Sequence, residues 1–297
     1  MPNSFSQQQT GIICALGAFV LWGVFPVYFK LVDHIPPLEM LCHRIVWSVF
    51  FLSILLFFSR GFTEIKELFK LPLTVFLLFI TGLLITLNWL AYIYAVANNM
   101  ITEASLGYFI NPLVNIVLGI LFLKEKTSLL EKIAIAIAFF AIAIEIVKMG
   151  SMPYIALFLA FSFGFYGLIR KMIRVNSFTG LFIETLLIAP LAILYLIYLG
   201  SSHTLGFSFD SFSWIIMLSG PVTVIPLLLF TGAASRIKLG TIGFIQYLSP
   251  TITFSLAILV YNEPLSTSRV VTFALIWLSL IFVITDTFWQ KRKKEIK

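Results

Sequence analysis

Ten apolar runs alternate along the chain with short polar segments. They cover residues 11–32, 38–58, 72–96, 102–123, 129–147, 152–169, 179–199, 212–234, 240–261 and 268–289. A membrane-spanning helix needs about 20 consecutive, mostly apolar residues. Strands of a membrane barrel would instead alternate polar and apolar residues over segments of about 10 residues, which none of these runs does. The pattern therefore predicts an all-α membrane protein with ten transmembrane helices.

Composition agrees with a location in the bilayer. Of the 297 residues, 60% are hydrophobic and 11% are charged, whereas soluble domains have about 45–50% apolar and about 25% charged residues. A soluble protein of this size has too little interior to bury so much apolar surface. The net charge of +7 does not indicate a nucleic-acid partner, because the basic residues lie between apolar runs rather than in one patch.

The basic residues predict the orientation in the membrane. If the N-terminus is cytoplasmic, sixteen of the 20 Lys and Arg residues, Arg170 among them, fall in cytoplasmic segments, and only Lys30, Lys148 and Arg269 fall outside. Cytoplasmic loops of membrane proteins carry such an excess. We expect a multi-pass protein of the cytoplasmic membrane with both termini inside, and residues 290–297 as a basic cytoplasmic tail.

The chain also contains an internal repeat. Residues 15–30 match residues 156–171 at a shift of 141, and residues 112–125 match residues 250–263 at a shift of 138. Each copy holds five runs, which is an odd number, so the second copy should cross the membrane in the opposite direction. Inverted repeats of this kind are typical of secondary transporters. The alternative is a duplication that builds a scaffold without transport.

This repeat predicts two domains of five helices each. The first covers residues 11–147 and the second covers residues 152–289. The fifth run of the first domain is apolar through its middle, with Ala134, Ala138 and Ala141 at a spacing that suits close helix packing. We therefore expect the fifth and tenth helices to stand beside the other eight.

Polar residues within the runs form two matching stripes. Tyr108, Asn111 and Asn115 share one helix face, since they are spaced i, i+3 and i+7. In the second copy Gln246, Ser249 and Thr253 repeat this spacing. Polar groups in hydrocarbon either line a cavity or join helices. Two symmetric stripes favour the cavity.

Prolines and aromatic residues add to this prediction. Proline frees the carbonyl four residues back, so Pro112, Pro226 and Pro250 predict broken helices beside the cavity. The residues that we expect to bind substrate are Trp22, Tyr28, Arg44, Asn88, Trp89, Tyr92, Tyr108, Asn111, Tyr166 and Gln246.

Charged residues within or near the runs are few. Arg44 either extends toward the membrane surface or faces the cavity and binds an anionic group. His43, Glu103 and Glu184 are candidates for proton coupling, because desolvation brings a carboxyl group closer to titrating near neutral pH. Glu125 and Glu263 end corresponding runs and are expected to stabilise a neighbouring loop or helix start.

Enzyme signatures are absent from the sequence. The three histidines show no metal-ligand spacing, and neither a nucleophile elbow nor a phosphate-binding loop is present. We expect no catalytic activity, no cofactor and no bound metal. An intramembrane enzyme such as a lipid-modifying transferase would need an acid, base or nucleophile clustered at one depth, whereas these groups are scattered.

Several motifs resemble those of the EamA branch of the drug/metabolite transporter superfamily, and within it those of RarD-type (chloramphenicol-sensitive) proteins. The resemblance covers residues 10–290 and rests on Trp22-Gly23, His43-Arg44, Asn88-Trp89, the run EASLGYFINPL at 103–113, Glu184-Thr185, Gln246-Tyr247 and Pro250-Thr251. It implies a bacterial inner-membrane permease or exporter with ten helices in two EamA repeats.

Together, the residues and the resemblance predict a secondary active or facilitative transporter. It would move a small metabolite or drug across the cytoplasmic membrane by alternating access. The expected partners are a small-molecule substrate and the lipid bilayer, with no nucleic acid, and we expect either a monomer or a weak homodimer. Substrates vary so widely within the superfamily that the resemblance does not identify the cargo.

Overall fold

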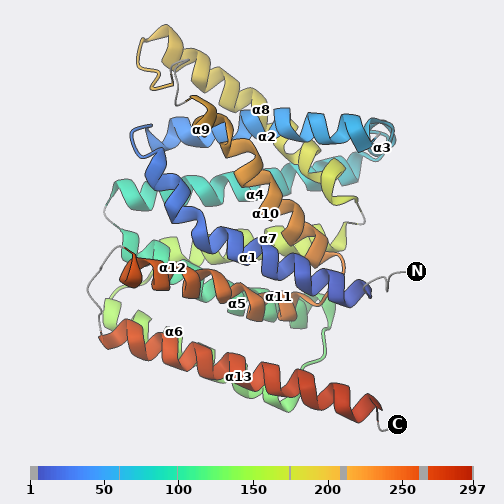
Figure 1. The fold of residues 1–297 in the computed structure, drawn as a ribbon, viewed down its shortest axis with the longest axis vertical. Coiled ribbons are helices and arrows are strands. Elements are labelled where there is room, and N and C mark those ends of the chain that lie inside the picture. Colours follow the sequence, from blue (N-terminus) through green and yellow to red (C-terminus); the bar gives the residue numbers. More distant parts are fainter. Residues whose placement is uncertain are drawn as a thin grey trace.

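The computed structural model describes residues 6–59, 61–98, 100–173, 175–207, 213–260 and 267–295, and these residues form helices and connecting segments without strands. The helices are α1 (Gln7–Leu31), α2 (Pro37–Ser59), α3 (Phe62–Leu68), α4 (Pro72–Ala97), α5 (Ile101–Leu123), α6 (Leu129–Met149), α7 (Tyr154–Met172), α8 (Ser177–Ser201), α9 (Ser213–Met217), α10 (Ser219–Ala234), α11 (Leu239–Gln246), α12 (Leu248–Leu259) and α13 (Thr267–Glu295). Figure 1 shows the long helices lying side by side in the bundle.

Among the described residues, eight segments are long and apolar enough to cross a membrane, and α13 contains a shorter apolar segment, Val270–Asp286. Two of the eight, Ser213–Ala234 and Leu239–Leu259, each join two consecutive helices. Helix α6 occupies the remaining predicted run, and its apolar segment is shortened by charged residues near both ends. The structure thus confirms an all-helical membrane protein.

Both interruptions within these joined segments lie three residues before a proline. Leu218 separates α9 from α10 and precedes Pro221, and Tyr247 separates α11 from α12 and precedes Pro250. Since proline has no N–H, the carbonyl four residues earlier loses its helical partner. The interruption near Pro250 agrees with the prediction, and the one near Pro221 was not predicted.

The expected helix breaks at Pro112 and Pro226 are wrong. Helix α5 is continuous through Pro112, and α10 is continuous through Pro226. One missing backbone bond does not interrupt a helix whose neighbouring bonds and packing persist.

Helix packing repeats between the two halves. Helices α1, α2, α4, α5 and α6 correspond in sequence order to α7, α8, α10, α11–α12 and α13. Helix α1 packs on α10 and α12, as α7 packs on α4 and α5, and α2 packs on α10 as α8 packs on α4. The pairs α2–α8, α5–α11 and α6–α13 join corresponding helices.

Two close glycine contacts, one for each half, show this correspondence at the level of atoms. A Cβ on Gly23 would lie 2.7 Å from Cβ of Ile252, and a Cβ on Gly164 would lie 2.6 Å from Cγ1 of Val114. Gly23 and Gly164 are corresponding residues at the shift of 141, and Val114 and Ile252 correspond at the shift of 138. Glycine is therefore needed at both positions for α1 to approach α12 and for α7 to approach α5.

Helices α1 and α7 run in opposite directions. Helix α1 begins at Gln7, whose Oε1 accepts a hydrogen bond from Arg236 Nε at 3.1 Å. Helix α7 ends beside the same connection, where Lys171 Nζ donates to the Ala234 carbonyl at 3.0 Å. Figure 1 shows that α13 ends on the side of the molecule where α1 begins. We call this side the terminal end and the other side the opposite end.

Helices α6 and α13 form a pair at the edge of the bundle (Figure 1). Ala134, Ala138 and Ala141 are fully buried, and Thr272 Oγ1 of α13 donates to Glu145 Oε1 of α6 at 2.6 Å. This arrangement agrees with the expectation that the fifth and tenth helices stand beside the others.

Candidate functional site

Arg44 lies at the junction of α1, α2, α4 and α10. Its Nε donates a hydrogen bond to Thr223 Oγ1 at 3.0 Å. Its guanidinium carbon lies 4.1 Å from the centre of the Trp89 ring and 5.2 Å from that of the Phe29 ring. Only 9% of the residue is exposed. The side chain is therefore buried between the helices.

Tyrosines surround this arginine. Tyr28 and Tyr108 interact electrostatically with Arg44, and the ring centres of Tyr92 and Tyr108 are 6.0 Å apart. Tyr108 is 47% exposed and Tyr92 is 38% exposed, so both rings have surface free for further contact. We call Tyr28, Arg44, Trp89, Tyr92 and Tyr108 the arginine–aromatic cluster. It combines one cation with several aromatic faces.

Within the part of the chain that the structure describes, no carboxylate lies within 4.0 Å of Arg44. Glu39, one turn before it on α2, is fully buried and accepts hydrogen bonds from the backbone N–H groups of Gly206 at 3.0 Å and Phe207 at 2.9 Å. His43 Nε2 is 3.5 Å from the same carboxylate, and the His43 ring lies 4.9 Å from that of Phe207. The carboxylate of Glu39 therefore binds the backbone at Gly206 and Phe207.

A second buried arginine lies nearer the terminal end. Arg170 Nε is 3.4 Å from Glu184 Oε1, and Thr81 Oγ1 donates to the same oxygen at 2.6 Å. Arg170 is 4% exposed and Glu184 is 1% exposed. Tyr166 interacts electrostatically with both residues. We call Thr81, Tyr166, Arg170 and Glu184 the ion-pair cluster.

Burial of Arg170 was not expected, because the apolar run that contains most of this helix ends at residue 169. Arg170 instead belongs to helix α7 and is buried. The polar surroundings that allow its burial come from α4 and α8, which sequence spacing on α7 does not reveal.

The two clusters occupy corresponding junctions. The arginine–aromatic cluster lies where α2 meets α1 and α10, and the ion-pair cluster lies where α8 meets α7 and α4. Arg170 corresponds to Phe29, and Glu184 corresponds to His43, at the shift of 141. The repeat thus places one arginine at each junction, but on different helices and with different partners.

Other predicted site residues join helices to one another. Asn88 Nδ2 donates to the Leu159 carbonyl at 2.8 Å and to Ser162 Oγ at 2.9 Å, which ties α4 to α7. Asn115 Nδ2 donates to Gln246 Oε1 at 2.7 Å, which ties α5 to α11. The two polar stripes therefore meet at this bond.

Asn111 is buried, and its Oδ1 has no hydrogen-bond partner among the described residues. Thr253, from the second stripe, donates from Oγ1 to the Gly23 carbonyl at 3.1 Å. Each stripe thus includes a group that bonds to a neighbouring helix, and only Tyr108 belongs to the arginine–aromatic cluster.

Trp22 and Tyr166 lie in an aromatic core between α1, α7 and α10. The Trp22 ring centre is 5.6 Å from that of Phe163 and 5.8 Å from that of Phe230. Tyr166 is fully buried, and its ring stacks on Phe230 at 5.9 Å. These contacts place both residues in the helix packing.

The three candidates for proton coupling are separated. Glu103 Oε2, at the start of α5, accepts a hydrogen bond from the Ile155 backbone N–H at 3.2 Å. His43 lies beside Glu39 and Glu184 lies in the ion-pair cluster. In the described residues no group of three or more His, Cys, Asp or Glu side chains could hold a metal ion.

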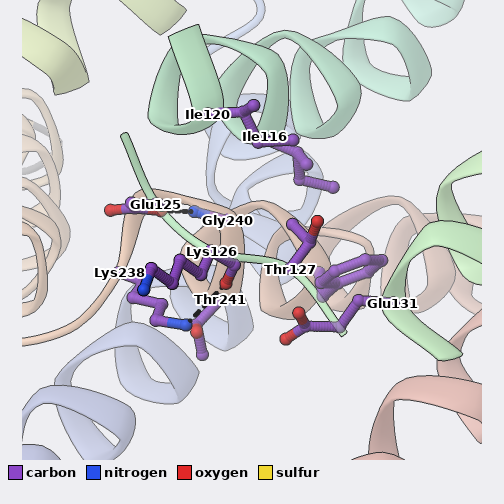
Figure 2. Close-up of a pocket in the computed structure, with 10 residues that line it drawn as sticks. Ile116, Ile120, Glu125, Lys126, Thr127, Glu131, Lys238, Gly240 and Thr241 are labelled. Atoms are coloured by element: carbon purple, nitrogen blue, oxygen red, sulfur yellow. Dashed lines mark hydrogen bonds between the residues drawn. The ribbon is translucent and has the colours of Figure 1, made fainter. Parts of the chain in front are cut away.

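The terminal end is tied by a set of hydrogen bonds centred on Glu125 (Figure 2). Its Oε1 accepts from the Leu239 N–H at 2.8 Å, and its Oε2 accepts from the Gly240 N–H at 2.9 Å. Lys238 Nζ donates to the Lys126 carbonyl at 2.9 Å beside them. A carboxylate at a helix start binds the free N–H groups there.

We call this set the terminal clasp. It joins the end of α5 to the start of α11 and borders a small pocket lined partly by Ile116 and Phe244. The clasp confirms the expectation that Glu125 stabilises a neighbouring helix start. Glu263, its sequence counterpart, lies outside the described residues.

Thr223 and Phe29 contact Arg44, and Thr81 donates to the carboxylate that pairs with Arg170, but sequence reasoning did not assign these residues to a site. Thr223 was visible as a polar residue within a run, three residues before Pro226. Phe29 and Thr81 carry no local signal, since their contacts come from helices distant in sequence.

The chain matches the model of the EamA-like transporter family over residues 9–146 and 151–285. It is 45% identical to protein RarD of Salmonella typhi over 97% of this chain and 99% of that protein. It is 43% identical to protein RarD of Escherichia coli over 97% of this chain and 98% of that protein. An uncharacterized transporter of Vibrio cholerae is also 43% identical, over 94% of this chain and 93% of that protein.

A solved crystal structure shares the fold. It superposes with a TM-score of 0.72 and covers 93% of this chain and 97% of its own, at 17% sequence identity.

Proposed function

Because the chain belongs to the EamA-like transporter family, we propose that it carries a small metabolite or drug across the bacterial inner membrane by alternating access. It acts as a secondary active or facilitative transporter. The observation that carries the proposal is the arginine–aromatic cluster, in which a buried cation and aromatic faces of the first repeat meet beside Thr223 of the second.

In the proposed topology ten helices cross the membrane as two inverted repeats, residues 11–147 and 152–289. The opposite directions of α1 and α7 and the exchanged packing support this arrangement. The terminal end faces the cytoplasm, in line with the excess of basic residues in cytoplasmic loops. The basic residues on helices or connections at that end include Lys66, Lys70, Lys124, Lys126, Lys171, Arg236 and Lys238.

Substrate binds at the arginine–aromatic cluster. The rings of Trp89, Tyr92 and Tyr108 provide large apolar faces, and the exposed surface of the two tyrosines gives access to them. Arg44 orients the polar part of the substrate. Trp22, Asn88, Tyr166 and Gln246 act less directly, by holding the helices that carry these groups.

Alternating access requires that one end closes while the other opens. In this conformation the terminal clasp and the ion-pair cluster hold the terminal end together. Opening that end breaks the contacts of Glu125 with the start of α11. Of the three candidates for proton coupling, Glu184 is best placed, because it belongs to the buried contacts at this end.

A ligand screen followed by transport assays tests the proposal. Purified protein is screened by thermal shift against metabolites and drugs, since a ligand stabilises the state that it binds. Each hit is then assayed for counterflow in proteoliposomes. We expect at least one hit to exchange across the membrane in wild-type but not in protein-free liposomes. Stabilising hits that never exchange would contradict a transport function.

Cysteine accessibility distinguishes transport from a scaffold function. In a Cys14→Ser/Cys42→Ser background, Tyr108→Cys is expected to react with a membrane-impermeant thiol reagent, and a transported hit should slow the reaction. Ala138→Cys, on the buried face of α6, is the control that should stay unlabelled. A scaffold predicts that no transported compound alters labelling at residue 108.

A further inference from the structure

We infer that the substrate is a small organic anion, whose negative charge binds to Arg44 and whose apolar body packs on the surrounding rings. This inference rests on the proposed transport function and names the class of substrate. It follows from the difference between the two buried arginines.

Charge balance is the first observation. The guanidinium of Arg170 has a carboxylate partner 3.4 Å away, whereas that of Arg44 has none within 4.0 Å among the described residues. A buried charge without a partner is costly, and more so in hydrocarbon. Glu39 does not fill the role, because its two oxygens accept backbone hydrogen bonds from Gly206 and Phe207. A bound anion would supply the missing counter-ion.

The free donors of Arg44 are the second observation. A guanidinium has five N–H donors in one plane. The Nε donor is used by Thr223, and no described residue accepts a hydrogen bond from the Nη groups. Stacking on Trp89 uses the face of the guanidinium and leaves its edge free. This edge matches the two oxygens of a carboxylate or the oxygens of a sulfonate.

Access to the cluster is the third observation. Arg44 lies deep, but Tyr108 and Tyr92 have nearly half and over a third of their surface exposed. Their rings offer contact to an apolar or aromatic group adjoining the charged end. A single anionic group next to an apolar body fits this arrangement, and a cation would be repelled by Arg44.

Three probes of the same size and different charge test the inference. Purified full-length protein in a non-ionic detergent is titrated with phenylacetate, phenylacetamide and phenethylammonium, and the thermal midpoint and tryptophan fluorescence are recorded. We expect phenylacetate to bind at least tenfold more tightly than phenylacetamide and phenethylammonium to bind most weakly. In Arg44→Gln this preference should disappear, and in Arg44→Lys it should persist in part.

Two controls keep the result interpretable. Lys148→Gln removes a positive charge from an exposed position at the opposite end and should keep the preference. The ligand-free thermal midpoint of Arg44→Gln should stay near that of wild type, which shows that any loss of binding is not a loss of folding.

Several outcomes overturn the inference. These are equal binding of phenylacetate and phenylacetamide by wild type, failure of phenylacetate to bind, or an unchanged preference in Arg44→Gln. A shift with phosphatidylglycerol in mixed micelles but not with phenylacetate would assign the anion to a lipid headgroup instead of a substrate. Transport of only neutral or cationic hits refutes the anion class and leaves the transport function intact. Selective anion binding without exchange in proteoliposomes refutes the transport function instead.

Discussion

The arginine–aromatic cluster and the ion-pair cluster place the same functional group at corresponding junctions of the two repeats. At the ion-pair cluster Glu184 pairs with Arg170 and accepts a hydrogen bond from Thr81, the three residues come from different helices, and both charged groups are buried. At the arginine–aromatic cluster Arg44 meets rings and a hydroxyl, and two neighbouring tyrosines remain exposed. A repeated backbone can therefore carry a buried ion pair in one half and the proposed binding site in the other.

This difference has a physical consequence for stability. A buried ion pair contributes little compared with an apolar core, but removing one partner leaves an uncompensated buried charge. Substitution of an arginine that has no charged partner among the described residues breaks no ion pair, so the free energy of unfolding should fall less. The four predictions below test this contrast, from the largest expected effect on the free energy of unfolding to the smallest.

The largest effect is expected for Arg170→Met. This change leaves Glu184 buried without its cation and should lower the free energy of unfolding by about 3–5 kcal/mol. Unfolding by sodium dodecyl sulfate in mixed micelles measures it. The double variant Arg170→Met/Glu184→Leu should recover most of the loss. Glu67→Gln, which breaks the exposed pair with Lys70, is the control and should change stability by less than about 1 kcal/mol.

A smaller loss is expected for Glu125→Gln in the terminal clasp. The amide can accept only one of the two backbone hydrogen bonds from Leu239 and Gly240, so stability should fall by about 1.5–3 kcal/mol. Hydrogen exchange should also become faster at the start of α11. Unchanged exchange there, together with unchanged stability, would show that the clasp does not hold the terminal end.

The next prediction compares Thr81, which donates to Glu184 in the ion-pair cluster, with Thr223, which accepts from Arg44. Thr81→Val removes the donor to the Glu184 carboxylate and should cost about 1–2 kcal/mol. Thr223→Val removes the acceptor from Arg44 and should cost about half as much, since the ring contacts of Arg44 persist. The same unfolding titration compares both variants. A larger cost for Thr223→Val than for Thr81→Val would reverse the contrast between the two sites.

The smallest effect on stability is expected for Arg44→Gln. Removing an uncompensated buried charge offsets the lost contact with Trp89, so the free energy of unfolding should change by less than about 1 kcal/mol in either direction. A loss as large as that of Arg170→Met would mean that Arg44 has a structural counter-ion in the chain. Arg44→Met, which keeps the apolar stem, separates the charge from the packing of the side chain.

Much of the architecture is predictable because it depends on local pattern. Apolar runs of about 20 residues predict the helices, and the interruption before Pro250 follows from a missing N–H. The same local rule failed at Pro112 and Pro226, because neighbouring bonds and packing hold those helices continuous. Applied to Pro221, the rule that proline lacks an N–H also predicts the interruption at Leu218.

The site was only partly predictable. Five of the predicted binding residues meet in the arginine–aromatic cluster, and their role there remains a prediction. Asn115 and Gln246 were grouped in separate stripes, whereas the structure joins them by a hydrogen bond between α5 and α11. Helical spacing shows which residues share a face, but it does not show which partner that face meets.

The sequence by itself determined that this chain is a helical membrane protein built from two similar halves, since hydrocarbon demands long apolar helices and the repeat is visible in the residues. It also singled out Arg44 as an unusual charge within a run. Only the tertiary structure decided that Arg170 is buried with a carboxylate and that Arg44 is buried with no carboxylate partner among the residues that the structure describes. The physical reason is that a charge is balanced by groups close in space, and Thr81, Arg170 and Glu184 come together only when three different helices pack.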